Sequence, residues 1–454
     1  MSKPIKIKKG LDIPMQGEAE KILNTAPRSA TYSLCPPDFH SLTPKMLLKE
    51  GEKVKAGTPL FFDKYNEKIV FTSPVSGTFS DLVRGEKRRI LRIVIEADQE
   101  DEYVDFGAAD PKDLSREQVI EKLLKSGLWP SIRQRPYSVI ANPNDVPKAI
   151  FISAFDSAPL GPDLDFIING QEKEFQVGLN ALKKLTDGKI HLGVHAENTT
   201  SKGFLQAEGV RVNTFKGPHP AGNVGIHIHH VDPIADKDDI AWYLGVQHVI
   251  TIGRLFERGI YDATKIVALT GSEVLNPRYY RVTSGAKVSD VILQNIRKEE
   301  GLNTRIISGN VLTGMHIEPE GYIRYYHDQI SIIPEGDKPE IFGWITPNLD
   351  KFSVSRTFPA FLMPWKKYRL NTNIRSGERP FVITGLYEKV LPMEIMPMQL
   401  VKSIMINDID MMEKLGIYEV APEDFALCEY VCPSKIDFQD WIMEGLDTIR
   451  KEFA

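Results

Sequence analysis

The sequence is poor in cysteine: its 454 residues include three, Cys35, Cys428 and Cys432. Three cysteines cannot build a disulfide framework, and this scarcity is typical of a protein kept in a reducing compartment. An excess of basic residues is also lacking. The net charge at pH 7 is −5, so the sequence gives no basic surface for nucleic acid or for anionic lipid.

Long apolar runs are absent as well. The longest, around residues 149–155, has the length of a strand and falls far below the roughly 18 residues that a membrane-spanning helix requires. The first residues, MSKPIKIKKGLDIPM, contain lysines but no apolar core, so we expect no signal peptide. If the protein acts at a membrane, a partner must hold it there.

What is present is the composition of an ordinary globular protein. Apolar residues make up 42% of the chain and charged residues 26%, a balance that excludes an intrinsically disordered chain. The chain is too long for one hydrophobic core, so we expect roughly two to four domains.

Residues 45–95 indicate a small β-domain, because short β-rich runs alternate with glycine and proline. The phrases EGEKVKAGTPL and SPVSGT resemble the biotinyl/lipoyl, or barrel-sandwich, fold. In that family a lysine at a hairpin tip carries the cofactor. The family's spacing, counted back from Pro74, predicts Asn66 at the tip, with Lys68 on the following strand. We therefore expect a β-barrel used for packing and docking, with a prosthetic-arm carrier as the less favoured alternative.

The next part of the chain predicts an α/β domain. Ser115 and Gln118 form a capping box at the start of a helix that Gly127 ends. Strands are predicted at residues 149–155, 189–194 and 209–214, and helices at 175–185 and 248–258. Strand, helix and strand in succession favour a right-handed crossover and a Rossmann-like sheet.

Residues 265–292, KIVALTGSEVLNPRYYRVTSGAKVSDVI, resemble the small β-grasp (SLBB-type) module of the flavin subunit of complex I. The pattern predicts short strands about Tyr279–Val282, a turn at Gly285 and a helix entered near Ser289. After Arg379 the chain is expected to be mostly helical, and the methionines between Met393 and Met412 are expected chiefly in a core.

These patterns together predict a multidomain α/β protein. Residues 1–110 form an N-terminal segment with the barrel-sandwich β-domain, and residues 111–260 form the Rossmann-like domain. Residues 261–340 form the β-grasp module. Residues 375–454 form a helical domain that carries a degenerate iron–sulfur motif.

That motif is LCEYVCPSK. RnfC and the ferredoxins hold iron–sulfur clusters with C-x2-C-x2-C-x3-C-P, since each cluster needs four thiolates. Here Cys428 and Cys432 stand at the last two positions, while Pro422 and Phe425 stand at the first two and cannot ligate iron. We predict no cluster. Zinc bound by the C-x3-C pair is the competing interpretation, although no second ligand pair follows.

A second cofactor motif is also incomplete. RnfC and the complex I flavin subunit carry a glycine-rich loop, G-x-G-G-A-G-F-P, whose bare backbone approaches flavin and nucleotide phosphates. The corresponding segment here, SGLWPSIRQRPYS at residues 126–138, keeps only Gly127. Bulky side chains fill the remaining positions, so we expect neither a flavin nor an NADH site.

Five segments match the NqrA family in order: GLDIPMQG, SGLWPSIRQRPYS, SAFDSAPLGPD, GPHPAGNVGIHIHHVDP and ALCEYVCPSK. They extend from Gly10 to Lys435, so the chain resembles this family over nearly its whole length. The resemblance implies a subunit of a six-subunit complex of the bacterial inner membrane that passes electrons from NADH to quinone and exports sodium. It implies a peripheral position at the cytoplasmic face and partners among the other subunits, especially the membrane-anchored flavin subunits.

The resemblance further implies that quinone is the substrate. A quinone ring needs apolar or aromatic walls, and its carbonyl oxygens need hydrogen-bond donors. Two segments offer both, and packing is the competing explanation for each. The candidate residues are Trp129, Arg133, Arg135 and Tyr137 in the degenerate loop, and Arg28, Tyr32, Phe39 and His40 in a proline-flanked loop.

The histidines at positions 219, 227, 229 and 230 are the remaining candidates for chemistry. His227 and His229 are predicted on one face of a strand, but no spacing fixes a third metal ligand, so we expect them to bond backbone groups. We assign no metal site, no covalently bound cofactor and no complete catalytic site to the isolated chain. An NADH-oxidising flavoprotein subunit of an Rnf-type complex is the alternative function, opposed by the missing glycines.

Overall fold

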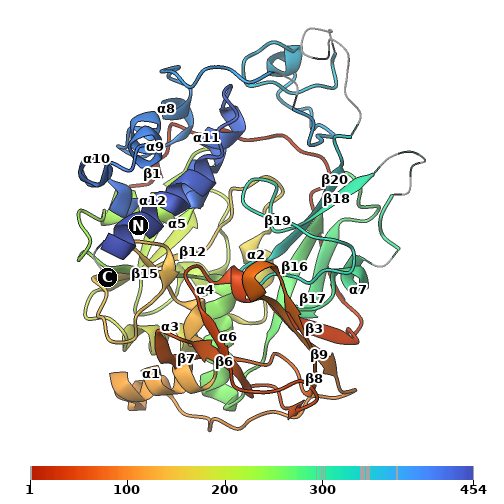
Figure 1. Cartoon of the computed structure of the whole chain (residues 1–454), viewed down its shortest axis with the longest axis vertical. Coiled ribbons are helices and arrows are strands. Elements are labelled where there is room, and N and C mark those ends of the chain that lie inside the picture. The colour runs from red at the N-terminus through yellow and green to blue at the C-terminus, as the bar shows by residue number, and fades with distance from the viewer. Residues whose placement is uncertain are drawn as a thin grey trace.

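The structure is a computed structural model. It describes residues 3–452, except 293, 298, 300, 302, 338–342, 344–347 and 375–376. Four sheets and a group of C-terminal helices make up the molecule (Figure 1). Among the described residues, no helix has the length and apolar character needed to cross a bilayer.

The β-domain consists of two small sheets that face each other. One has the order β3 (Thr31–Leu34), β9 (Ile90–Ala97), β8 (Gly77–Arg84) and β5 (Lys53–Val54). The other has the order β4 (Pro44–Met46), β6 (Pro59–Asp63) and β7 (Asn66–Thr72). Phe61 and Phe71 stack at 4.5 Å in the core between them. The predicted β-domain is therefore confirmed.

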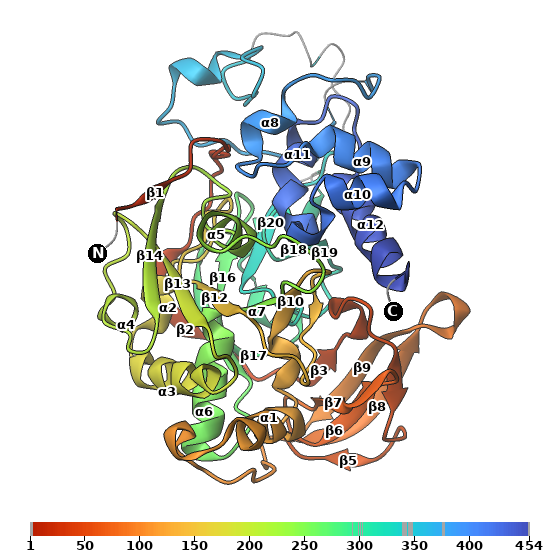
Figure 2. The same ribbon diagram turned by 90° about the vertical axis from the view of Figure 1, so that its left-hand side faces the viewer.

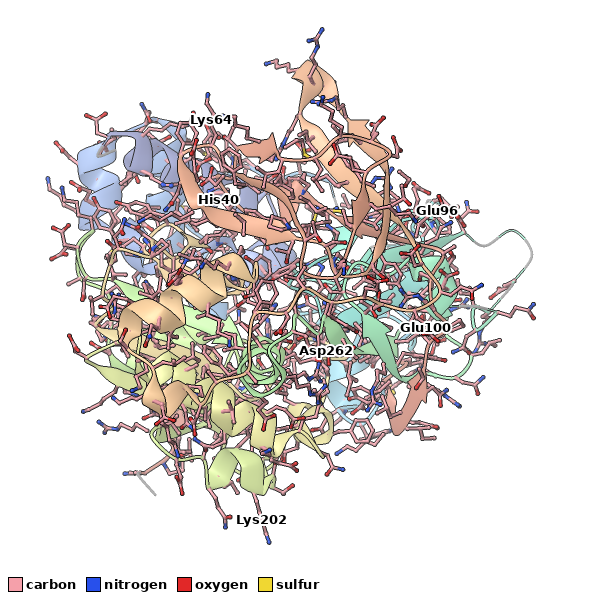
Figure 3. All side chains as sticks on the ribbon, turned by 90° about the horizontal axis from the view of Figure 1, so that it is seen from below. His40, Lys64, Glu96, Glu100, Lys202 and Asp262 are labelled. Atoms are coloured by element: carbon pink, nitrogen blue, oxygen red, sulfur yellow. The ribbon has the colours of Figure 1, made fainter. Side chains whose placement is uncertain are left out.

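The predicted position of the hairpin tip is wrong. Asp63 pairs with Asn66, so the turn between β6 and β7 consists of Lys64 and Tyr65. The pairing of β6 with β7 shifts register before Asp63, which moves the turn away from the position that the spacing from Pro74 predicts. A lysine thus occupies the tip, at the outer edge of the domain (Figure 3). Asn66 no longer provides an argument against a carrier lysine.

The α/β domain is built on a seven-stranded sheet. Its order is β1 (Ile5–Lys6), β14 (Arg211–Lys216), β13 (Lys189–His195), β12 (Ala149–Ser153), β15 (Ala241–Gly245), β10 (Arg133–Arg135) and β11 (Val139–Ile140). The first five strands are parallel, while β10 and β11 are antiparallel additions. The helices of this part are α1 (Arg116–Lys125), α2 (Leu164–Ile168), α3 (Glu172–Lys183), α4 (Lys202–Leu205), α5 (Val224–Val231) and α6 (Val246–Arg258).

Successive side chains of the central strands point to opposite faces of the sheet, where they pack in two separate cores. Ile150 and Trp242 pack with α3 and α6, whereas Phe151 and Tyr243 point to the opposite face. That opposite face is covered by α5 and by the C-terminal helices (Figure 2). The strands predicted at residues 149–155, 189–194 and 209–214 and the helices predicted at 175–185 and 248–258 are present, and so is the capping box at Ser115.

A six-stranded sheet forms the third part, with the order β19 (Met315–His316), β18 (Thr304–Ser308), β20 (Gln329–Pro334), β16 (Thr264–Thr270), β17 (Arg278–Thr283) and β2 (Glu20–Thr25). The turn at Gly285 has φ +74°, and α7 (Val288–Ile292) follows as predicted. β2 comes from the N-terminal segment and pairs in parallel with β17. The first residues of the chain thus join two sheets outside the β-domain.

The C-terminal part is helical, as predicted. It contains α8 (Tyr387–Val390), α9 (Pro397–Met405), α10 (Ile409–Lys414), α11 (Ala426–Val431) and α12 (Phe438–Glu452). Met393, Met398 and Met412 lie in its core, while Met396 and Met411 are exposed. The methionines therefore serve packing only in part.

Candidate functional site

The site of interest lies on β10 and β15, one strand away from the point at which the order of the strands in the central sheet reverses. The chain proceeds from β12 to β13 and β14 on one side, and then returns to place β15 on the other side of β12. Ligands of open α/β sheets bind outside the carboxyl ends of strands at such a reversal. β10 pairs with β15 in a register that sets Arg133 opposite Tyr243.

Arg133 is held between two tyrosine rings. Its guanidinium carbon lies 4.6 Å from the ring centroid of Tyr243 and 4.5 Å from that of Tyr326. Burial lowers the pKa of Arg133, but Tyr243 and Glu423 outweigh it and the pKa is raised, so the side chain stays cationic. Within the described part of the chain, only ring contacts are found for this guanidinium, and its buried Nε has no hydrogen-bond partner.

Tyr326 brings the two predicted loops together. Its ring lies 5.6 Å from that of Phe39, which comes from the proline-flanked loop, and it also covers Arg133 from the degenerate loop. His248, in the first turn of α6, lies 5.8 Å from the same ring. The result is an aromatic wall beside a cation that has no hydrogen bond to a described residue.

The other candidates of the degenerate loop are engaged in packing. Trp129 is fully buried, and its indole N–H donates to the Ala141 carbonyl at 2.7 Å. Arg135 is also fully buried and donates to Asp424 at 2.6 Å and to Glu423 at 3.1 Å. Tyr137 has φ +77° and meets Tyr418 edge to face, with 6.1 Å between ring centroids.

The other candidates of the proline-flanked loop lie apart from Arg133. Arg28 makes a bidentate ion pair with Asp101 at 2.7 and 2.8 Å. Tyr32 is buried, and its hydroxyl accepts a hydrogen bond from the Ser29 amide. His40 lies 2.9 Å from Asp447 of α12, where the β-domain meets the C-terminal helices (Figure 3). The structure therefore brings Phe39 and Arg133 together, but not all eight residues.

The sequence patterns did not reveal Tyr243, Tyr326 and His248 as neighbours of this site. Tyr243 is the cross-strand neighbour of Arg133, a pairing that requires the register of β10 on β15. Tyr325 and Tyr326 stand next to His327 and Asp328, and this aromatic and titratable run was the available signal.

A small cavity adjoins the aromatic wall. Its lining includes His248, Lys265, Tyr325 and Asp328, and its volume is about 20 Å³, room for about one water molecule. The Lys265 ammonium donates to the Tyr325 carbonyl at 3.1 Å and to the His327 carbonyl at 2.6 Å. A quinone ring is far larger than this cavity, so a ring binds here only if side chains around it move. Tyr326 does not line the cavity, and its hydroxyl donates to the Pro130 carbonyl at 2.6 Å.

Comparison with known proteins gives the family. Residues 5–98 match the model of the NqrA N-terminal barrel-sandwich hybrid domain, residues 114–261 that of the NqrA second alpha/beta domain, and residues 266–318 that of the NQRA C-terminal (SLBB) domain. A Na(+)-translocating NADH-quinone reductase subunit from Rhodopirellula baltica is 38% identical over 98% of both chains. The corresponding subunits from Photorhabdus laumondii and Neisseria meningitidis are 39% and 38% identical, over 99% of this chain and 100% of theirs. The chain belongs to the NqrA family.

Family membership confirms the resemblance seen in the sequence, together with the barrel-sandwich and SLBB-like parts. Members of the family are subunits of a sodium-translocating NADH-quinone reductase. The Rnf-type flavoprotein alternative is therefore not favoured.

The degenerate glycine loop now has a structural role. Gly127 has φ +72°, and a Cβ there would lie 2.3 Å from the Thr72 hydroxyl oxygen of the β-domain. A glycine is therefore required here for two reasons: the positive φ that ends α1, and the close approach of the backbone to β7. A 3-10 turn at Trp129–Ser131 and strand β10 occupy the segment that follows.

The two cysteines of the degenerate cluster motif are buried in the helical part. Burial raises the pKa of Cys428 well above its usual range, so its thiol stays protonated. Cys432 Sγ lies 3.2 Å from the Tyr387 hydroxyl. Over the residues that the structure describes, no group of three or more His, Cys, Asp and Glu side chains is arranged to hold a metal ion.

The prediction that His227 and His229 share a strand face is wrong. Both lie in helix α5, where residues two apart point in different directions. The local turns at Pro220 and Asn223 lead into a helix, and an apolar-histidine alternation cannot reveal this. His227 is buried, stacks on Phe215 at 3.9 Å and lies 2.8 Å from the Ala221 carbonyl.

Bonding to backbone groups is confirmed for His227 and for His230, whose Nδ1 lies 3.0 Å from the Ile226 carbonyl. It holds in part for His229, whose Nε2 accepts from the Glu394 amide at 3.2 Å while its Nδ1 lies 2.9 Å from the Glu419 carboxylate. It is wrong for His219, whose Nδ1 lies 3.0 Å from the Ser157 hydroxyl.

We expect the His227→Gln variant to resist acid better than the wild-type chain. Burial lowers the pKa of His227 to about 3. Between about pH 6.5 and pH 3, His227 is therefore protonated in the unfolded chain but neutral in the folded chain. This linkage costs the wild-type fold about 2 kcal/mol at pH 5, and it is absent in the variant. Urea unfolding at pH 7 and pH 5 measures it. An equal loss of stability in both proteins would contradict the prediction.

Proposed function

We propose that this chain is a quinone-site and docking subunit of the six-subunit complex to which its family belongs. It works at the cytoplasmic face of the bacterial inner membrane, held by the other subunits and especially by the membrane-anchored flavin subunits. The four-part division at residues 1–110, 111–260, 261–340 and 375–454, with a Rossmann-like second part, belongs to the same proposal. The observation that carries it is the cationic Arg133 between two tyrosine rings, with no hydrogen bond to a described residue.

Arg133 supplies what a quinone carbonyl needs. Reduction places negative charge on the carbonyl oxygens, and a fixed guanidinium stabilises that charge more strongly than the neutral oxygen. Phe39 and Tyr326 supply the aromatic wall against which the ring packs. The ring enters when Tyr326 leaves the guanidinium face, so that one ring replaces another over the same cation.

Nearby polar groups raise the pKa of Arg133, but none of the described residues accepts a hydrogen bond from its guanidinium. Glu423 pairs with Arg135 and acts on Arg133 through space. Arg135 has its own carboxylate in Asp424. Arg133 therefore remains available to an incoming oxygen, whereas Arg135 does not.

We further propose that the chain holds no flavin, iron–sulfur cluster or covalently attached group, and that electrons reach quinone from cofactors of other subunits. The bulky loop after Gly127 and the protonated thiol of Cys428 support this. We expect purified chain to show no visible absorbance band and an intact mass equal to that of the sequence. A stoichiometric yellow or brown chromophore, or added mass on Lys64, would overturn this part.

The direct test of the site is a titration of the isolated chain with a short-chain quinone, followed by tryptophan fluorescence. Trp129 and Trp242 are buried, and their ring centroids lie 5.5 Å apart. They come from the segments that carry Arg133 and Tyr243, so a quinone ring bound there is expected to quench their fluorescence. Saturable quenching supports the proposal. Quenching that rises linearly without saturation would show that no such site forms in the isolated chain.

A further inference from the structure

A cleft of about 320 Å³ lies at the amino ends of strands β12, β13 and β14. Lys189, His191 and Arg211 line it from the strands, and Asp232 lines it from the end of helix α5. Sites for small ligands have volumes of about 300–1,000 Å³, so this cleft has room for a small compound.

The strand register places three donor side chains on one wall of the cleft. Lys189 and His191 are two residues apart on β13, so they point to the same face of the sheet. Arg211 of β14 is the cross-strand neighbour of His191. The wall is therefore fixed by the pairing of two strands, and side chains that can donate hydrogen bonds border one space.

His191 offers one N–H to a ligand in the cleft. It is 5% exposed, and its ring stacks on that of Phe151 with 4.8 Å between the centroids. The side-chain nitrogen of Asn213 lies 3.1 Å from His191 Nδ1 and donates to the Arg211 carbonyl at 3.2 Å. Because this nitrogen is a donor, Nδ1 accepts, and the imidazole proton is on Nε2. Burial, together with Arg211, lowers the pKa of His191 to about 4, so the ring is neutral at pH 7.

Two cations of the cleft are unpaired. Lys148 is not one of them, because its ammonium lies 2.7 Å from Asp239 and 3.1 Å from Asp232. The carboxylate of Asp232 is therefore already balanced by a lysine. Across the described residues, no carboxylate lies within ion-pair distance of Lys189 or Arg211, and both side chains are exposed.

We propose that this cleft binds the phosphate group of a small phosphorylated compound. A phosphate monoester carries about two negative charges at pH 7 and three acceptor oxygens. These match the two unpaired cations, Lys189 and Arg211, and the three donor side chains. A carboxylate offers one charge and two oxygens, which leaves a donor and a cation without a partner. Ala149 and Val231 supply apolar wall for the rest of the ligand.

The phosphate cleft does not depend on the proposed quinone site. His191, Phe151, Tyr243 and Arg133 follow one another as cross-strand neighbours on β13, β12, β15 and β10. Neighbouring strands are about 4.8 Å apart, so His191 and Arg133 are separated by about 14 Å of sheet. Failure of either proposal would therefore leave the other standing.

The test is calorimetric titration of the full-length chain with inorganic phosphate near pH 7 at constant ionic strength. We expect saturable binding. Arg211→Met and Lys189→Met are each expected to weaken it by at least about tenfold, through loss of a charged donor. His191→Phe keeps a ring beside Phe151 but lacks the N–H, and a loss of about fivefold is expected. Thermal unfolding without phosphate checks that each variant is folded.

Lys202→Met provides a matched control. Lys202 is an exposed lysine of the same domain, in α4 beyond the carboxyl end of β13, and it projects at the bottom of Figure 3. Its replacement is expected to leave phosphate affinity unchanged. Equal losses in the Lys202 and Lys189 variants, or heat that shows no saturation, would overturn the proposal. Tighter binding of succinate than of phosphate would overturn it in favour of a dicarboxylate site.

Discussion

Replacement of Arg133 by methionine is expected to weaken binding of a short-chain quinone to the chain by at least about tenfold, since a hydrogen bond from a charged donor contributes about 1.5–3 kcal/mol. Methionine keeps most of the length and apolar bulk between Tyr243 and Tyr326 but removes charge and donors. The Arg133→Lys variant keeps the charge and is expected to bind with intermediate affinity. The measurement is the fluorescence titration with each variant.

Arg28→Met is the matched control for this prediction. Arg28 is also an arginine of a predicted quinone loop, but it is already paired with Asp101. Its removal is expected to change the affinity for quinone by no more than about twofold, which corresponds to the small free energy of one exposed ion pair. If Arg28→Met weakened binding as strongly as Arg133→Met, the assignment of the site to Arg133 would fail.

Replacement of Arg135 by methionine is expected to destabilise the fold by about 3–5 kcal/mol, because it leaves a buried carboxylate without its partner. Arg135 and Asp424 are both fully inaccessible, and their contact joins the α/β sheet to the C-terminal helices. Burial raises the pKa of Asp424 even with Arg135 beside it. Without the arginine this carboxyl is expected to take up a proton, so the deficit shrinks as the pH falls.

Urea unfolding near pH 7 and pH 5 measures both parts of this prediction. The double variant Arg135→Met, Asp424→Leu removes both charges and is expected to recover most of the lost stability. A single variant that loses less than about 1 kcal/mol would show that the ion pair adds nothing beyond its replacement by apolar contacts.

The α/β part was predictable because local patterns decide its elements. The capping box at Ser115, the end of α6 at Gly259 and the buried run at Ala149–Ser153 each depend on neighbours within one element. The hairpin tip was not predictable from spacing, since an irregular pairing between Phe62 and Asp63 shifts it. Helix α5 was mistaken for a strand because alternating isoleucine and histidine imitates a period of two.

The candidate site was predictable only in part, and for a physical reason. Arg133 and Phe39 are recognisable as donor and aromatic wall from residue type alone. Their meeting depends on Tyr326, which lies just before β20 and almost 200 residues further along the chain than Arg133. Burial of Arg135 likewise depends on the packing of the C-terminal part, and burial of Trp129 depends on the core that the β-domain and the α/β domain share; no local pattern reveals either.

Photo-crosslinking of the assembled complex with an azido-quinone, followed by peptide mapping, tests the central claim most directly. We expect label in this chain, on the segment around Phe39, on residues 129–137 or at Tyr326, and loss of that label in the Arg133→Met variant. Label found solely on other subunits would contradict the assignment of the quinone site to this chain.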